Sequence, residues 1–143
     1  MLKANSAYPL MKKIEHLGIA VTDLQASIGV FEKLLNTTCY KMEEVISEGV
    51  RTAFFQVGES KIELLEATNP ESPIAKFLAK QGSGIHHIAF EVEDIESEME
   101  RLSSLDFVLI QQTPKDGADD KRTAFLHPKS TKGVLVELCQ EKN

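Results

Sequence analysis

Two histidines and two glutamates are the residues of this sequence best suited to bind a metal ion. His16 and His87 are 71 residues apart, and Glu63 and Glu137 are 74 residues apart. Each lies in a short, largely apolar segment, where burial of a carboxylate or an imidazole is costly unless a partner compensates for it. A divalent cation provides such compensation, and imidazole together with carboxylate suits borderline or hard divalent metals. We therefore predict that the four side chains converge on one divalent ion.

The near-equal spacing of the two pairs comes from an internal repeat. RTAFF (51–55) recurs as RTAFL (122–126), and IEHLGIAVTDL (14–24) aligns with IHHIAFEVEDI (85–95) at the same step of 71. IELLEA and VELCQE, which contain the two glutamates, align after three additional residues in the preceding turn. Similarity that is kept in strands and tolerates a loop insertion indicates a duplicated unit. A single strand histidine is more often simply hydrogen-bonded and a single strand glutamate solvated, so the metal prediction depends on the matched positions.

Each repeat predicts a strand, a helix and three further strands. Apolar runs rich in β-branched residues indicate strands, and the apolar spacing from Leu24 to Leu35 indicates a helix capped by Thr22 or Asp23. The predicted elements are strand 14–21, helix 24–35, strands near 38–45, 50–57 and 60–67, strand 85–92, helix 94–104, and strands near 107–112, 122–127 and 133–140.

These elements predict an α+β fold in which two tandem βαβββ modules form a cupped, incomplete eight-stranded barrel around a metal cleft. Between the modules, Ser72 and Pro73 are suited to the cap and first turn of a short helix. The expected segments are a flexible N-terminal extension at 1–10 and a single domain at 11–143, made of modules at 11–67 and 85–143 joined by a linker at 68–84.

Side chains alternate along a strand, which places the candidate ligands on defined faces. His16 shares its face with Gly18, a small residue that leaves open space beside the imidazole. His87 is followed on its face by Ala89, which is also small. We expect the neighbouring His86 to point the other way and to be structural.

The composition is that of an ordinary globular protein, with 42% hydrophobic and 27% charged residues. The net charge is −6 and the basic residues are scattered, which argues against a nucleic-acid surface or an anionic-membrane patch. No apolar run approaches the roughly 20 residues of a membrane-spanning helix. Cys39 and Cys139 form no disulfide or zinc motif, so we expect buried, reduced thiols in a protein of the cytoplasm or of an organelle matrix, with the cytoplasm as our prediction.

Four segments resemble the methylmalonyl-CoA epimerase branch of the vicinal oxygen chelate superfamily. They are IEHLGIAV, IELLEAT, SPIAKFLAKQGSGIHHIAFEVEDI and FLHPKSTKGVLVEL. The first two are shared more loosely with glyoxalase I, and the last two are specific to the epimerases. The resemblance covers residues 11–140 and implies metal ligands at His16, Glu63, His87 and Glu137.

The resemblance also implies an activity, the epimerisation of (R)- and (S)-methylmalonyl-CoA through an enolate by a homodimer that uses one divalent ion. Co²⁺ is the expected metal, with Zn²⁺, Mn²⁺ or Ni²⁺ as alternatives. Inversion needs a proton removed on one face of the carbon and returned on the other, so two acid–base groups should flank it. Some family members place a glutamate base at the strand position of Thr52, but a threonine cannot act as a carboxylate base. We therefore assign the two catalytic roles to Glu137 and Glu63.

Other functions found with this fold are alternatives to the epimerase. A lactoylglutathione lyase like glyoxalase I shares the metal scaffold, and an extradiol dioxygenase uses iron held by two histidines and one carboxylate. A small-molecule binding protein of the same fold is a third alternative. The fourth ligand candidate, Glu63, argues against the dioxygenase, and SPIAKFLAK and HPKSTKGVLVEL favour the epimerase over the lyase.

Contacts with coenzyme A are the least defined part of the resemblance. Lys129 lies in the turn HPKS, where it is our candidate to meet a phosphate of coenzyme A. The loop KDGADDKR carries Asp119 and Asp120 and differs from the glycine-rich loop common in the family.

Overall fold

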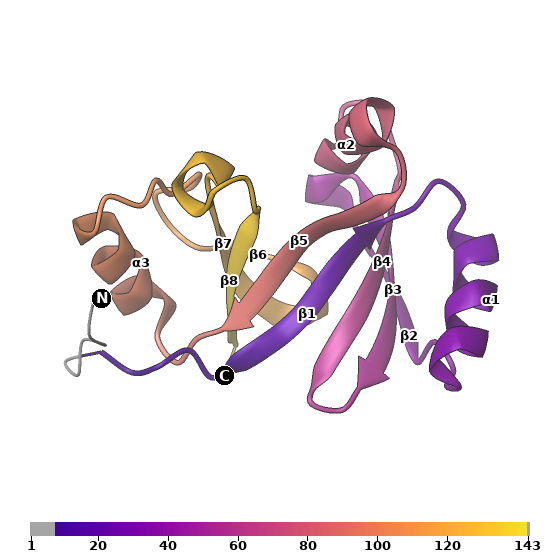
Figure 1. Ribbon diagram of the computed structural model, residues 1–143, viewed down its shortest axis with the longest axis horizontal. Helices are drawn as coiled ribbons and strands as arrows, with labels where there is room; N and C mark the ends of the chain where they lie inside the picture. The colour runs from indigo at the N-terminus through magenta and orange to yellow at the C-terminus, as the bar shows by residue number, and fades with distance from the viewer. Residues whose placement is uncertain (1–7, 143) are drawn as a thin grey trace.

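The computed structural model describes residues 8–142 (Figure 1). Most of the N-terminal extension predicted at 1–10 lies outside the described residues. The helices and strands in chain order are β1 (Lys13–Ala20), α1 (Leu24–Leu35), β2 (Lys41–Val45), β3 (Val50–Val57), β4 (Ser60–Ala67), α2 (Pro73–Gln81), β5 (Gly84–Glu91), α3 (Ile95–Ser104), β6 (Lys115–Asp116), β7 (Lys121–Leu126) and β8 (Val136–Glu141).

All eight strands belong to one curved sheet, in the order β2-β3-β4-β1-β5-β8-β7-β6. β1 pairs in parallel with β4, and β5 pairs in parallel with β8. The two halves join where β1 and β5 run antiparallel, side by side across the middle of the molecule (Figure 1). The predicted α+β class and the cupped eight-stranded sheet are confirmed, while the exact limits of the two modules stay a prediction.

Equivalent residues begin the two outer helices. Oδ1 of Asp23 accepts a hydrogen bond from the amide of Ala26 at 3.1 Å, and Oδ1 of Asp94 accepts one from the amide of Ser97 at the same distance. Each carboxylate satisfies an amide that has no partner within the first helical turn. Ser72 caps α2 in the same way. The caps predicted at Asp23 and Ser72 are confirmed.

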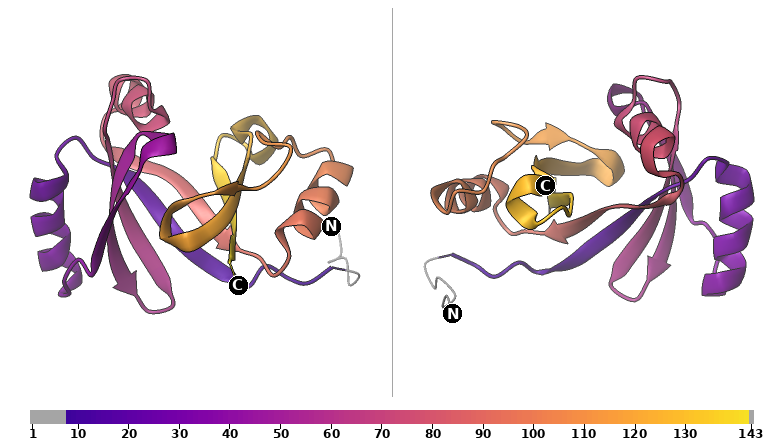
Figure 2. Two further views of the ribbon diagram at one scale, coloured as in Figure 1. Left: turned by 180° about the vertical axis from the view of Figure 1, so that it is seen from behind. Right: turned by 45° about the horizontal axis from the view of Figure 1, so that its top comes forward.

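Helices α1 and α3 lie on the face of the sheet opposite the candidate ligands, whereas α2 lies on the ligand side, where Ile74 lines the cavity. Figures 1 and 2 show α1 and α3 at opposite ends of the molecule. Alternate residues of the inner strands of each half form the two cores beneath these helices, with Ala53, Phe55 and Leu64 under α1 and Ala124, Leu126, Val136 and Leu138 under α3. Because side chains alternate, Glu63 and Glu137 point to the other face.

The strand predicted near 107–112 is wrong. Leu109 forms only an isolated bridge with Leu126, and the edge strand is the two-residue β6. The amide of Phe125 donates to Oε1 of Gln111, at 2.7 Å, where a continued ladder would use a backbone carbonyl. This side-chain bond ends the pairing after one bridge. β2 and β8 are formed, each beginning three residues later than predicted.

None of the helices between residues 8 and 142 is long and apolar enough to cross a membrane.

Candidate metal centre and its cavity

Three donor atoms from three strands meet on the inner face of the sheet. Nε2 of His16 on β1 lies 3.0 Å from Nε2 of His87 on β5. Oε1 of Glu137 on β8 lies 3.1 Å from the first of these nitrogens and 3.0 Å from the second. All three side chains are buried. On the strand between them, β5, Ala89 pairs with His16 on one side and with Glu137 on the other. The side chain between His16 and Glu137 on this face of the sheet is therefore only the methyl group of Ala89.

The spacing of the three atoms fits a single cation. Two ligands about 2.1 Å from one ion and at right angles to each other are about 3 Å apart. Although burial opposes charge on Glu137, its hydrogen bonds with His16 and His87 and their charges hold its pKa well below the usual range. Burial likewise lowers the pKa of His16, but the carboxylates of Glu63, Glu137 and Glu15 outweigh it and raise that pKa to about 10. The surroundings thus favour positive charge at the point where a divalent ion would bind.

Glu63 lies on the other side of the His16 ring. Its Oε2 is 3.1 Å from Nδ1 of His16, whereas Nε2 of His87 and Oε1 of Glu137 lie beside Nε2. Two groups of metal-compatible atoms result, one with His16, His87 and Glu137 and one with Glu15, His16 and Glu63. Burial, offset in part by the charge of His16, raises the pKa of Glu63 to about 7. The set of four ligands around one ion stays a prediction.

A pair of β-bulges places a second polar residue beside each histidine. The register between β1 and β5 shifts between Ile14 and His16, which leaves Glu15 unpaired, and shifts again so that His86 is unpaired. Oε1 of Glu15 lies 2.7 Å from Nδ1 of His16, and Nδ1 of His86 lies 2.9 Å from Nδ1 of His87. A carboxylate at Nδ1 orients a metal-binding histidine so that Nε2 faces the ion.

The orientation predicted for His86 is therefore wrong, because a bulge interrupts the alternation of side chains along the strand. His86 lines the same cavity as His87 rather than the opposite face. Its ring packs edge-on against Phe77 of α2, with ring centroids 5.0 Å apart. Burial and the charge of His87 lower the pKa of His86 to about 4, so His86 is neutral near pH 7.

Gly18 makes room for the His87 imidazole. A Cβ atom at this position would lie 2.6 Å from Nδ1 and 2.7 Å from Nε2 of His87, closer than real Cβ atoms approach other atoms. Gly18 also pairs with Glu63 on its other side, as Ala89 does with Glu137. The open space expected beside the histidines is thus filled by the second imidazole.

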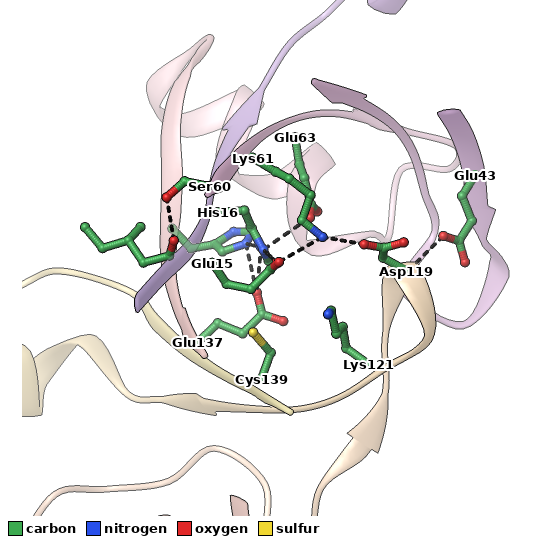
Figure 3. A network of polar contacts seen from close by, with 12 residues as sticks. Glu15, His16, Glu43, Ser60, Lys61, Glu63, Asp119, Lys121, Glu137 and Cys139 are labelled. Carbon is green, nitrogen blue, oxygen red and sulfur yellow. Dashed lines mark hydrogen bonds and ion pairs between the residues drawn. The ribbon is translucent and has the colours of Figure 1, made fainter. Parts of the chain in front are cut away.

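A chain of charged contacts connects the centre to a loop of the other half (Figure 3). Nζ of Lys61 lies 2.9 Å from Oε2 of Glu15 and contacts a carboxylate oxygen of Asp119. Asp119 also binds Lys41 at 2.9 Å, and its amide donates to Oε1 of Glu43 at 2.8 Å. The sequence did not predict this network. A buried lysine two residues before Glu63 on the same face was the available signal.

A cavity of about 300 Å³ adjoins the candidate ligands. Its walls come from both halves of the chain and include Thr52 and Leu65 from the first, and Lys115, Lys121 and Thr123 from the second. This volume is at the small end of ligand pockets and suits a short acyl group rather than a whole coenzyme. Lys129 is exposed in the short 3₁₀ segment Pro128–Thr131 and does not line the cavity, so its contact with a coenzyme phosphate stays a prediction.

The sequence and the fold agree with one family of known proteins. Residues 15–125 match the Glyoxalase/Bleomycin resistance protein/Dioxygenase superfamily. The chain is 40% identical over 133 residues to an ethylmalonyl-CoA/methylmalonyl-CoA epimerase of Cereibacter sphaeroides, which covers 92% of this chain and 99% of that protein. It is 41% identical over 127 residues to the mitochondrial methylmalonyl-CoA epimerase of Dictyostelium discoideum, with 88% of this chain and 76% of that protein covered.

Comparison with solved structures agrees with the sequence comparison. The crystal structure of methylmalonyl-CoA epimerase from Mycobacterium tuberculosis superimposes with a TM-score of 0.91 at 33% identity, covering 100% of this chain and 94% of that one. The chain therefore belongs to the Glyoxalase/Bleomycin resistance protein/Dioxygenase superfamily and, within it, to the methylmalonyl-CoA epimerase family.

Proposed function

We propose that this protein interconverts (R)- and (S)-methylmalonyl-CoA by removing the α-proton on one face and returning a proton on the other. The triangle formed by Nε2 of His16, Nε2 of His87 and Oε1 of Glu137 carries this proposal, because it offers a cation site inside a cavity of acyl size. The family's named activity supplies the substrate.

His16, His87 and Glu137 would hold one divalent ion. Glu63 is the candidate fourth ligand; it would have to turn away from Nδ1 of His16 to reach this ion and would leave the ion to act as a base. We propose Co²⁺ as the metal, with Zn²⁺, Mn²⁺ and Ni²⁺ as alternatives, since mixed imidazole and carboxylate donors accept all of them. When bound, such an ion supplies a Lewis acid that stabilises the negative charge developing on the substrate oxygens, an effect worth several kcal/mol.

Glu63 and Glu137 are our candidates for the two acid–base groups. They contact different nitrogens of the His16 ring, with Oε2 of Glu63 3.1 Å from Nδ1 and Oε1 of Glu137 3.1 Å from Nε2. The pKa of Glu63, about 7, suits a group that gains and loses a proton at neutral pH. Its position away from the other three donors supports a role as a base, because a carboxylate bound to a metal is a weaker base than a free one.

The proposed reaction moves one proton in each half-step. Glu63 takes the proton from the α-carbon, and the electrons of the broken C–H bond enter the enolate. Glu137, a carboxylate in the free protein, must take up a proton as the substrate binds. It gives this proton to the opposite face, a new C–H bond forms with inverted configuration, and proton exchange with water restores both carboxyl groups. The reverse reaction uses the same two groups in exchanged roles.

The decisive experiment combines metal analysis with two assays. Purified protein loaded with Co²⁺ is given (R)-methylmalonyl-CoA in D₂O, and the (S) isomer and the deuterium at the α-carbon are measured. We expect epimerisation with deuterium incorporation, and no turnover of the glutathione hemithioacetal of methylglyoxal. Metal-loaded protein that fails to epimerise the first substrate, or that turns over the second, contradicts the proposal.

We further propose that the protein acts as a homodimer in the cytoplasm. Val30 and Leu34 are exposed by 60% and 70% and lie four residues apart on one face of α1, an arrangement suited to a partner surface. Cys39 and Cys139 are free thiols, as expected in a reducing compartment. Sedimentation equilibrium of the wild type and of Leu34→Lys tests the dimer, and an unchanged monomer mass for both contradicts it.

A further inference from the structure

Thr52 on β3 has a buried hydroxyl group without a hydrogen-bond partner. The residue is fully buried, and Oγ1 is the only buried side-chain polar atom without a partner in the part of the chain that the structure describes. Burial of an unpaired hydroxyl lowers stability, and native proteins keep few such groups. The unpaired atom therefore needs an explanation.

Thr52 faces the cavity beside the candidate base. It pairs across the sheet with Leu65, while Glu63, two residues earlier on the same strand and the same face, pairs with Phe54. Thr52 and Glu63 are thus diagonal neighbours, a relation that places Cα atoms about 7–8 Å apart. Thr52, Glu63 and Leu65 all line the cavity.

The internal repeat provides a matched hydroxyl in the other half. Thr123 lies 71 residues later in the second copy of RTAF, and it also lines the cavity. Its Oγ1 donates to the backbone carbonyl of Lys115 on β6 at 3.4 Å. No equivalent acceptor reaches Thr52. The two hydroxyls occupy equivalent places in the fold, but in the part of the chain that the structure describes only that of Thr52 has no partner.

We propose that Oγ1 of Thr52 donates a hydrogen bond to an oxygen at the malonyl end of the substrate and so fixes the α-carbon beside Glu63. This inference rests on the proposed function. The malonyl end carries acceptors only, the carboxylate and the thioester oxygen, and a threonine hydroxyl has one proton to give. The free protein bears the cost of the unpaired hydroxyl, and the bound substrate removes it. Thr52 is therefore a residue that selects substrate at the expense of stability.

The test compares Thr52→Val, which replaces the hydroxyl with a methyl group of similar size, with Thr52→Ser, which keeps it. We expect Thr52→Val to bind methylmalonyl-CoA about 10- to 100-fold more weakly, the range for a hydrogen bond to a charged or strongly polar acceptor, while its melting temperature equals or exceeds that of the wild type. Thr52→Ser should bind within about threefold of the wild type. Thr123→Val, which loses a formed bond, should melt at a lower temperature than the wild type.

Binding of propionyl-CoA, which lacks the carboxylate, identifies the acceptor. If Thr52→Val binds propionyl-CoA as well as the wild type does, the acceptor is the carboxylate, and an equal loss for both ligands identifies the thioester oxygen. Unchanged affinity of Thr52→Val for methylmalonyl-CoA overturns the inference, as does a lower melting temperature, which would mean that the hydroxyl is satisfied within the free protein. Failure of the wild type itself to epimerise overturns the proposed function instead.

Discussion

Nε2 of His16 and Nε2 of His87 lie 3.0 Å apart although 71 residues separate them in the chain. The contact exists because β1 and β5 pair antiparallel at the centre of the sheet, so each half of the chain brings one imidazole to the same point. Glu137 reaches this point from β8. We therefore expect changes at the three residues to affect the centre as a whole, while the two hydrophobic cores beneath α1 and α3, on the opposite face, stay formed.

Removal of a ligand should abolish stabilisation by metal. A ligand that binds only the folded state stabilises it by about 2.7 kcal/mol at 100 times its Kd, which corresponds to several degrees in a chain of this size. We expect Co²⁺ to raise the melting temperature of the wild type by this amount and a chelator to reverse the rise. His87→Ala should fold but show no response to Co²⁺, as measured by differential scanning calorimetry with and without the metal.

His127 is the matched control for this prediction, because it is an exposed histidine that lines neither the cavity nor the centre. His127→Ala should respond to Co²⁺ as the wild type does. A metal response that survives in His87→Ala and is lost in His127→Ala would place the ion elsewhere.

Substitution of either acid–base candidate should separate the two faces of the reaction. General acid–base groups contribute about 10²- to 10⁴-fold, so Glu63→Gln and Glu137→Gln should each lose epimerisation by at least about 100-fold. Each variant should still exchange the α-proton of one isomer in D₂O, and the two variants should exchange opposite isomers. Deuterium incorporation, followed by mass spectrometry for each isomer separately, measures this.

Glu44→Gln serves as the control, since Glu44 is half exposed on β2 and pairs only loosely with Arg51, at 3.7 Å. Its epimerisation rate should be unchanged. Full epimerisation by Glu63→Gln with metal bound would remove Glu63 from the catalytic role.

A methyl group at residue 18 should displace His87 without unfolding the protein. The added Cβ of Gly18→Ala would overlap the imidazole, which must then turn away from His16 and Glu137. We expect a loss of Co²⁺ affinity of at least about tenfold, measured by isothermal titration calorimetry. Gly29→Ala is the control, because a Cβ there meets nothing within 4 Å and alanine favours helix α1 by about 0.5–1 kcal/mol. Equal metal affinity in both variants contradicts the packing argument.

Asp119 should make stability depend on pH in the acid range. Partial burial opposes its charge, but the ammonium groups of Lys61 and Lys41 outweigh burial and lower the pKa of Asp119 below its usual value of 3.8. A carboxyl group whose pKa is lower in the folded protein than in the unfolded chain stabilises the fold at pH values above the unfolded pKa. This stabilisation is lost as the pH falls through the pKa of the folded protein. Asp119→Asn should therefore be less stable than the wild type at pH 7, by about 1.5–3 kcal/mol, and the difference should shrink as the pH falls below 3.8.

Urea unfolding of both proteins across this pH range measures the difference. Asp120→Asn is the matched control, because the Asp120 side chain is 80% exposed and lies 3.8 Å from its single partner, Lys142. Its effect should stay within about 0.5 kcal/mol at every pH. A constant difference between Asp119→Asn and the wild type would show that the carboxylate charge is not the cause.

The internal repeat made the fold and the main members of the site predictable from sequence. Asp23 and Ser72 were identified as caps because capping depends on side chains next to the helix in sequence. His16, His87 and Glu137 were identified because their spacing is nearly the same in both copies. Local chemistry and symmetry were enough for these features.

Features that depend on strand register were not predictable. The bulges at Glu15 and His86 arise from the pairing of β1 with β5, and a pattern of alternation within one strand contains no information about them. The contact between Lys61 and Asp119 joins residues 58 apart in two different halves. The early end of pairing after Leu109 depends on one side chain, that of Gln111.

The antiparallel seam between β1 and β5 has a consequence for assembly. The strands that meet there are equivalent copies, so β5 of a second molecule could dock on β1 and present the same imidazole. If the stretch between β4 and β5 straightened instead of folding back, two polypeptides would exchange their C-terminal halves and rebuild two complete centres between them. We expect any such exchanged form to keep its metal content per chain, and only its molecular mass would reveal the swap.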